Sequence, residues 1–353
     1  MRSESLEFLR TLVDTPGPSG YEQPVQSVFR AYVARFADEV TTDVMGNVIA
    51  VRNPAGSPRI MLAGHADEIG FQVRYINDEG LLHFGPIGGH DPIVAAGQRV
   101  IVHGPNGPVV GVLGRKAVHL LDAGERDKAP DLKEMWIDIG AKSRDEAQAC
   151  VSIGDCVTYA AKAEALRGDI WVARSFDDKM GAFVIAEVLR LLSDRSHSAA
   201  VYAVATVQEE VGLRGARTSS SAIAPDVGIA VDVGHSTDFP GADKRSGGDI
   251  KLGSGPMIAR GPHINPHVFT RLVSAARDHE IPHTIEAIPS GTGTDADIIQ
   301  MAAGGVASGV VSVPLRYMHT PSEVLHLSDV ENAALLLAAF CERASPDDSW
   351  IPG

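Results

Sequence analysis

The chain has 353 residues, of which 44% are hydrophobic, and its formal net charge is −14. This length suggests one large domain with a second, smaller one, and the balance of hydrophobic and charged residues is that of an ordinary globular enzyme. The acidic excess argues against nucleic acid or an anionic membrane surface as the main partner, since both attract clustered lysine and arginine.

The sequence has neither the apolar segments of a membrane protein nor the pattern of a secreted one. No apolar run approaches the ~18–20 residues of a membrane span, and residues 1–17 favour an amphipathic helix over a signal peptide. Cys150, Cys156 and Cys341 show no CxxC pairing. We predict free thiols in a cytoplasmic protein, with a Cys150–Cys156 disulfide as the less favoured alternative.

The first elements in chain order are a helix and two strands. Ser19 and Glu22 have the spacing of a capping box, which predicts a helix from there to about residue 36. Residues 47–52 and 59–64 have the apolar pattern of strands. The segment between them consists of turn-forming residues.

After residue 70 the pattern changes to short β-like runs. Residues 104–108, "GPNGP", predict a hairpin, Ser143 should cap a short helix, and 122–133 reads as an exposed loop. We predict a β-rich domain over residues 67–164, inserted into a catalytic domain of residues 1–66 and 165–353.

From residue 168 onward apolar strands alternate with helices. Strands are predicted over 199–208, 226–234 and 307–314, and helices over 177–193, 265–280 and 328–344. Asn265 is the expected N-cap of the second helix, and Ser328 with Glu331 forms a capping box for the third. This alternation predicts an α/β fold with a mixed, largely parallel sheet and helices on both faces.

Acids and histidines follow the ends of these apolar runs or begin the helix at residue 177. In an open α/β sheet, ligands bind at the carboxyl ends of the strands, so most of these groups should converge on one site. The five groups are His65 with Asp67, Asp177 with Asp178, Glu209 with Glu210, Asp232 with His235, and His319 with Glu323.

Crowded carboxylates need a cation, and a mixture of imidazole and carboxylate suits zinc, cobalt or manganese better than calcium. Two histidines and three acids are enough for two ions roughly 3.5–4 Å apart with one bridging carboxylate. A further acid would then be free to act as a base. Because adjacent side chains at a strand end need not share a direction, Glu209 and Glu210 can divide these two tasks.

Each pattern also has a simpler interpretation. A Glu-Glu pair is usually solvated, and an Asp-Asp pair is more often a helix N-cap than a metal site. Five such groups in one chain favour the metal site over coincidence. The other histidines, including His263, are assigned to the surface or to ordinary packing. For "GTGTDAD" at 291–297 we favour a turn and cap over a wall of the substrate pocket.

At this point the chain resembles a known family over nearly its whole length. It is similar to the cytosolic dinuclear metallo-aminopeptidases that assemble as tetrahedral dodecamers, a family of glutamyl and leucyl aminopeptidases with members mislabelled as endoglucanases. The matching segments are "PGPSGYE", "AGHADEIGF", "WIDIGAKSRDEA", "SFDDKMG", "VQEEVGLRGA", "VDVGHSTDFPG", "GTGTDAD" and "RYMHTPSEV". A β-domain inserted between His65 and Asp177 is characteristic of this family.

The resemblance implies a role for each matching residue. Asp177 would be the bridging ligand. His65 and Asp232 would complete one metal site, and Glu210 and His319 would complete the other. Glu209 would be the general base, and Asp67 would hydrogen-bond His65 and fix its tautomer. The Asp177–Asp178 peptide bond would be cis. Two divalent ions, zinc or cobalt before manganese, are the implied cofactors.

The implied activity is removal of N-terminal residues from peptides with a free N-terminus. The inserted domain would be a PDZ-like barrel that mediates dimer contacts, and six dimers would form the dodecamer. A carboxypeptidase or deacylase of the same clan is the main alternative. A glycosidase fits less well because only 5% of the residues are aromatic, and a non-enzymatic metal-binding oligomer would leave Glu209 without a task.

Overall fold

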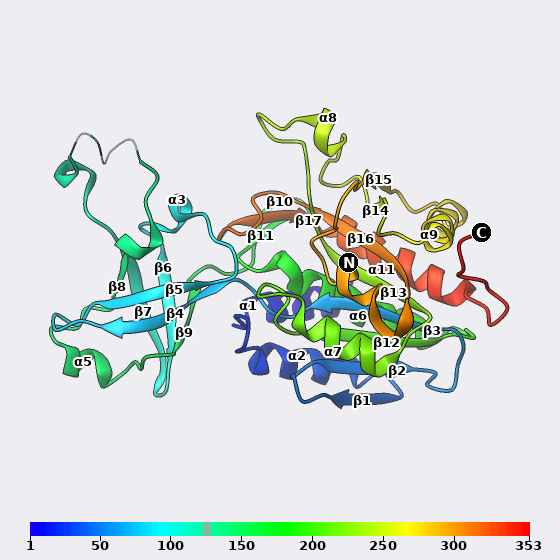
Figure 1. Ribbon diagram of the computed structural model, residues 1–353, viewed down its shortest axis with the longest axis horizontal. Coiled ribbons are helices and arrows are strands. Elements are labelled where there is room, and N and C mark those ends of the chain that lie inside the picture. Colours follow the sequence, from blue (N-terminus) through cyan, green and yellow to red (C-terminus); the bar gives the residue numbers. More distant parts are fainter. Residues whose placement is uncertain (123, 125–127) are drawn as a thin grey trace.

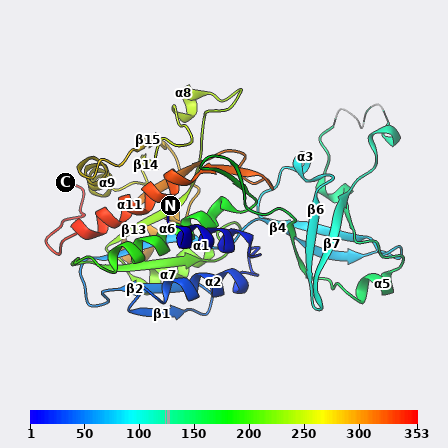
Figure 2. The same cartoon turned by 180° about the vertical axis from the view of Figure 1, so that it is seen from behind.

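A computed structural model describes residues 1–122, 124 and 128–353 of the chain. The molecule has a large α/β body and a smaller β-barrel that stands to one side of it (Figures 1 and 2). The barrel comes from the middle of the sequence, whereas both termini lie in the body. The predicted α/β class with a small inserted β-domain is therefore confirmed.

An eight-stranded sheet forms the centre of the body. Its strands are β1 (Glu39–Thr42), β2 (Val48–Arg52), β3 (Arg59–His65), β12 (Ala200–Thr206), β13 (Val227–His235), β14 (Met257–Arg260), β15 (Thr284–Ala287) and β16 (Ala307–Leu315). The order is β1-β2-β12-β3-β13-β16-β14-β15. The four central strands run parallel to one another, whereas β2 and β14 join them antiparallel.

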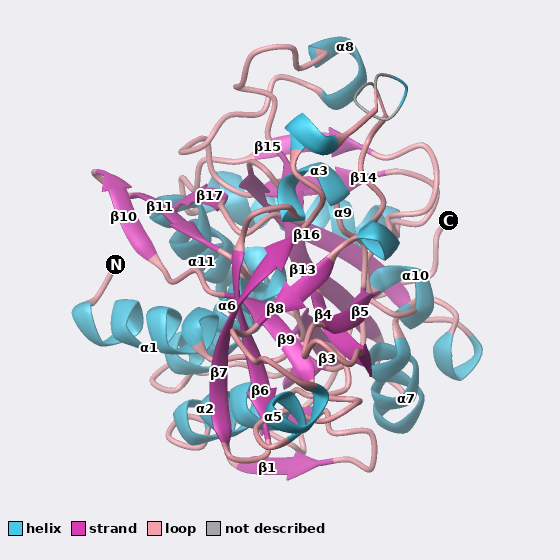
Figure 3. Cartoon of the chain, turned by 90° about the vertical axis from the view of Figure 1, so that its left-hand side faces the viewer, coloured by secondary structure: helices cyan, strands magenta, loops and turns pink. Residues whose placement is uncertain are grey.

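Helices cover both faces of this sheet, which explains why its central strands are apolar along their length. The helices are α1 (Ser3–Asp14), α2 (Gln23–Val33), α6 (Phe176–Leu192), α7 (Arg214–Ile223), α8 (Lys244–Gly247), α9 (Pro266–Asp278), α10 (Ala296–Ile299) and α11 (Leu327–Arg343). Ile60 and Leu62 belong to an apolar cluster that also contains residues of α1, α2, α6, α9 and α11, while Met61 and Ala63 belong to a second cluster with residues of α7 and α10. Figure 3 shows α1 and α2 on one side of the strands and α7 and α10 on the other.

The barrel has an apolar core of its own and closes in the order β4-β5-β8-β7-β6-β9. Its elements are β4 (Gly70–Ile76), β5 (Leu82–Ile87), α3 (Pro92–Ala95), β6 (Arg99–Gly104), β7 (Gly107–Gly114), η1 (Val118–Leu120), η2 (Leu132–Glu134), β8 (Trp136–Asp138), α5 (Arg144–Gln148) and β9 (Cys156–Tyr159). The predicted hairpin joins β6 to β7, and Ser143 caps α5 by accepting a hydrogen bond from the Glu146 N–H. Part of the predicted loop at 122–133 lies outside the described residues.

A buried ion cluster ties the barrel's two connections to the body. The Glu68 carboxylate lies 2.6 Å from Lys179 Nζ and 3.0 Å from Arg174 Nε. Arg174 also donates to the Ala161 carbonyl at 2.9 Å. Because Glu68 precedes the barrel and Ala161 follows it, the cluster holds both connections between the barrel and the body.

The body also contains a three-stranded sheet, made of β10 (Glu164–Arg167), β11 (Ile170–Ala173) and β17 (Glu323–His326).

Two predicted capping boxes are wrong. The N-cap residue of α2 is Glu22, and the Ser19 hydroxyl donates to the Asp67 carboxylate at 2.6 Å instead. His326, rather than Ser328, caps α11, because its Nδ1 accepts from the Ser328 N–H. In each case a neighbouring partner competes for the group that the local pattern had assigned to the helix end.

Two smaller predictions concern the whole chain. Cys150, Cys156 and Cys341 are free thiols, as expected. Within the part of the chain that the structure describes, no helix combines the length and the apolar character needed to cross a lipid bilayer.

Candidate metal centre

The carboxyl ends of the four central strands meet at one edge of the sheet. His65 is the last residue of β3, Glu209 and Glu210 follow β12, Asp232 lies near the end of β13, and His319 follows β16. These strands are parallel neighbours, so their ends bring the side chains together. The convergence expected from the sequence is observed.

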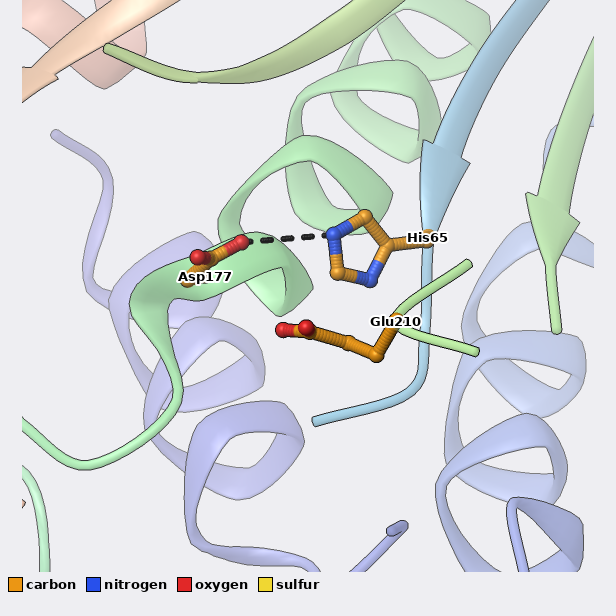
Figure 4. Close-up of side chains that lie close together, drawn as sticks. All are labelled: His65, Asp177 and Glu210. Carbon is orange, nitrogen blue, oxygen red and sulfur yellow. Dashed lines mark ion pairs between the residues drawn. The ribbon is translucent and has the colours of Figure 1, made fainter. Parts of the chain in front are cut away.

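Asp177 lies between the two histidines. Its Oδ1 is 3.3 Å from His65 Nε2, and its Oδ2 is 3.2 Å from His319 Nε2. Figure 4 shows the Asp177 carboxylate and the His65 ring facing each other, with Glu210 extending toward the same space. A carboxylate that offers one oxygen to each of two imidazoles has the arrangement of a bridging ligand between two metal ions.

Two groups of side chains offer ligand atoms within 4.8 Å of one another. The first is His65, Asp177 and Glu210, and the second is His65, Asp178 and Asp232. The oxygens of Asp178 already accept hydrogen bonds from the backbone N–H groups of His65 and Gly181, at 3.0 and 2.9 Å. Asp178 therefore holds the end of β3, and Asp232 is the freer donor of the second group. The Asp177–Asp178 bond is cis, as the resemblance implied.

The adjacent glutamates face different histidines. Glu209 Oε2 lies 3.8 Å from His65 Nε2, whereas Glu210 Oε1 lies 3.5 Å from His319 Nε2. Both glutamates lie in the turn that follows Gln208, which has a positive φ of 57°. This divergence allows the two carboxylates to have different tasks.

Asp67 supports this turn more than it supports His65. Its carboxylate accepts from the backbone N–H groups of Glu209 and Glu210, at 3.0 and 3.2 Å. Its Oδ1 is 3.5 Å from His65 Nδ1, but its backbone carbonyl is closer to that nitrogen, at 3.1 Å. Asp67 thus contacts the imidazole through two oxygens and also positions the glutamate pair.

Two buried acids have roles that the sequence did not reveal. Glu323 accepts from the backbone N–H groups of Asp177 and His319, both at 3.0 Å. Asp295 accepts from the Thr206 hydroxyl at 2.6 Å, and its other carboxylate oxygen is buried without a hydrogen-bond partner among the described residues. The signal for Glu323 was its place after His319 in "HTPSE", and that for Asp295 was the motif "GTGTDAD".

The electrostatics of this cluster fit divalent cations. Burial, together with the neighbouring carboxylates and against the positive charge of His65, raises the pKa of Glu209 to about 10, of Asp232 to about 8 and of Glu210 to about 7. Glu210 Oε1 is buried without a hydrogen-bond partner among the described residues. Cations among these groups would stabilise the ionised carboxylates, and the imidazole and carboxylate donors suit zinc, cobalt or manganese.

A pocket of about 510 Å³ opens over these side chains. His65, Asp177, Glu209 and Glu210 lie on its wall, and Thr292–Thr294 also form part of its lining. The segment 291–297 is therefore a wall of the pocket, which was the less favoured of our two interpretations. The segment also forms the predicted turn before α10, where the Thr294 hydroxyl accepts a hydrogen bond from the Ala296 N–H at 3.3 Å, although the Asp295 side chain makes no such bond.

The chain is similar to known proteins over almost its whole length. Residues 46–336 match the model of the M42 glutamyl aminopeptidase family. A lysyl aminopeptidase of Pyrococcus furiosus is 36% identical over 97% of this chain and 98% of its own length. The crystal structure of a TET aminopeptidase from a marine sediment thaumarchaeon has a TM-score of 0.93 and 36% identity, covering 96% of both chains.

A second related structure concerns assembly. It is the TET1 peptidase of Pyrococcus horikoshii, described as able to assemble into a tetrahedron or a large octahedral shell. It superposes with a TM-score of 0.86 at 31% identity, over 96% of this chain and all of that one.

Proposed function

Because this chain belongs to the M42 glutamyl aminopeptidase family, we propose that it is a metal-dependent aminopeptidase that removes N-terminal residues from short peptides. The observation that carries the proposal is the Asp177 carboxylate, which offers one oxygen to each of two histidines that follow different strands. Two divalent ions, zinc or cobalt before manganese, are the proposed cofactors.

The ligands of the two ions divide by position. Asp177 would hold both ions, His65 and Asp232 would complete one site, and His319 and Glu210 would complete the other. In support, Asp232 and Asp178 form one potential ligand group with His65, while Glu210 lies beside His319 at 3.5 Å. When bound, the ions lower the pKa of a water molecule and polarise the carbonyl of the scissile bond.

Glu209 is the proposed general base. It is the carboxylate of the pair that does not face His319, and it lines the pocket where a peptide would lie. Glu209 takes a proton from the attacking water and then gives it to the nitrogen of the leaving peptide, whose bond to the carbonyl carbon breaks. Asp67 holds the backbone of Glu209 and orients the ring of His65.

The free amino group of the substrate gives the activity its direction. A protonated α-amino group is attracted to the acids that surround the centre, whereas a blocked N-terminus has lost that charge. The pocket thus favours the first residue of a peptide over an internal one.

We further propose that the protein works as an oligomer in the cytoplasm, built from dimers and reaching a dodecamer. The domain at 67–164 would mediate the dimer, with residues 1–66 and 165–353 as the catalytic domain. Val110 and Val112, on the same face of β7, are 61% and 43% exposed, and an exposed apolar strand face is a common site of association. The related peptidase that forms shells supports this proposal.

The test is amino-acid release from one set of peptides with free or acetylated N-termini, with chelator and after zinc or cobalt is restored. We expect release from free N-termini only, loss with chelator and recovery with metal. Release from acetylated peptides or from the C-terminal end would instead indicate a deacylase or carboxypeptidase. No release with any metal would contradict a peptidase function altogether.

A further inference from the structure

One acid of the pocket belongs to a different part of the sheet from the metal centre. Glu286 lies on β15, the edge strand, and lines the pocket together with Ile288. On this strand Ile285 and Ala287 are exposed while Glu286 is only partly exposed. The alternation of the strand therefore turns Glu286 toward the pocket and its two neighbours toward solvent.

The Glu286 carboxylate has no partner. Among the described residues none forms a hydrogen bond or an ion pair with its side chain, and neither lysine nor arginine lines the pocket. Burial alone raises the pKa of Glu286 to about 6, so at neutral pH it is mostly ionised. A half-buried, ionised and unpaired carboxylate is costly unless a cation approaches it.

The lining of the pocket also suits a long aliphatic stem. Leu213, Ile288, Val310 and Met318 contribute apolar surface to the pocket, and threonines contribute hydroxyl groups. Lysine and arginine side chains bury such stems along apolar surfaces while their charged ends reach a polar partner. The pocket therefore combines an apolar path with an anionic end.

We propose that Glu286 is a specificity-determining residue and that the pocket prefers a peptide whose first side chain is cationic, lysine or arginine. This inference rests on the proposed aminopeptidase function and names its substrate class. An acidic first residue would meet Glu286 without a compensating positive group, so the preference differs from the one in the family's name. A solvated edge-strand acid without influence on substrates is the competing explanation.

The test compares first residues that differ only in charge. The p-nitroanilides of lysine, norleucine and glutamate are hydrolysed by the metal-loaded wild type, by Glu286→Gln and by Glu286→Lys. Norleucine has the lysine stem without the ammonium group. The control is Glu164→Gln, which removes an exposed strand carboxylate from the separate three-stranded sheet.

In the wild type we expect kcat/KM for lysine to exceed that for norleucine by about tenfold, the typical effect of one hydrogen bond between charged groups. Glu286→Gln should bring the ratio close to one while the norleucine value stays within about twofold. Glu286→Lys should favour glutamate over lysine, and Glu164→Gln should keep the wild-type ratio. A lysine-to-norleucine ratio that Glu286→Gln leaves unchanged overturns the proposal, as does a wild-type preference for glutamate.

The failure of the proposed function has a different signature. Chelator-sensitive release of norleucine tests the aminopeptidase activity whatever the ratio is. If no anilide is hydrolysed, the aminopeptidase proposal fails, and calorimetric binding of lysinol and norleucinol tests the pocket directly. Tighter binding of lysinol that is lost in Glu286→Gln supports the anionic subsite, and equal binding of the two alcohols contradicts it.

Discussion

The body buries many charged side chains, whereas the barrel buries almost none. In the body, the side chains of His65, Asp177, Asp178, Asp232 and Glu323 are all buried and at most 7% exposed. Between Gly70 and Tyr159, the one buried polar side chain among the described residues is Thr158, and the core consists of aliphatic and aromatic groups. Apolar burial stabilises a fold without a ligand, but buried acids need partners.

This difference separates two kinds of substitution. A change to a buried carboxylate of the body removes a partner from other buried groups, so it should affect metal binding or catalysis. A change on the outer face of the barrel removes surface that the fold does not need. Substitutions at Asp177, Glu209, Glu323 and Val110 test that separation.

Asp177→Asn should lose both activity and metal. The amide has one oxygen in place of two, so it cannot face both His65 and His319 as the carboxylate does. Metal analysis of the purified variant should find fewer ions per chain than in the wild type, and peptide hydrolysis should fall to background. Two retained ions would contradict the bridging role.

The Glu209→Gln variant should keep both ions. Its kcat should fall by about 10²–10⁴-fold, the range for removal of a general base. Glutamine preserves the shape and the backbone hydrogen bond to Asp67 but cannot accept a proton from water. The measurement is kcat on one peptide beside the metal content of the same preparation. Full activity would exclude Glu209 as the base, and loss of metal would make it a ligand.

Glu323→Gln should weaken metal binding by about 10–100-fold, the usual effect of a group that orients metal ligands. Both oxygens of Glu323 are used, by the N–H groups of Asp177 and His319, and glutamine can satisfy only one of them. Competition with a chromogenic chelator measures the affinity. Glu331→Gln, at an exposed carboxylate that pairs with the N-terminus, is the matched control and should bind metal normally.

Val110→Asp should have the smallest effect on the chemistry. Val110 is exposed on the barrel, so the charge should break an apolar contact between copies while kcat on a dipeptide stays within about twofold. Sedimentation of the variant should show a smaller particle. The separation of barrel and catalytic centre would be contradicted if the variant kept the particle size of the wild type. It would also be contradicted if the variant formed a smaller particle with a large loss of kcat.

Much of the body could be predicted from local patterns. Strands β12, β13 and β16 coincide with apolar runs, and α9 begins at Pro266 with Asn265 as its N-cap, as expected. The strand-end residues could be predicted too, because parallel strands bring their carboxyl ends to one edge. By contrast, local patterns predict no role for Glu323, and they do not single out Glu286.

Local sequence patterns show where the apolar runs lie and which acids and histidines follow them, since both depend on neighbouring residues. Which polar group bonds to which partner depends on how the chain packs in three dimensions. Glu323 and Asp177 are 146 residues apart in the sequence. Ser19 hydrogen-bonds to Asp67, 48 residues away, and does not cap the helix that follows it. Burial removes water as a partner, so each group bonds to the donor or acceptor that packing brings near it. Local spacing does not contain that information.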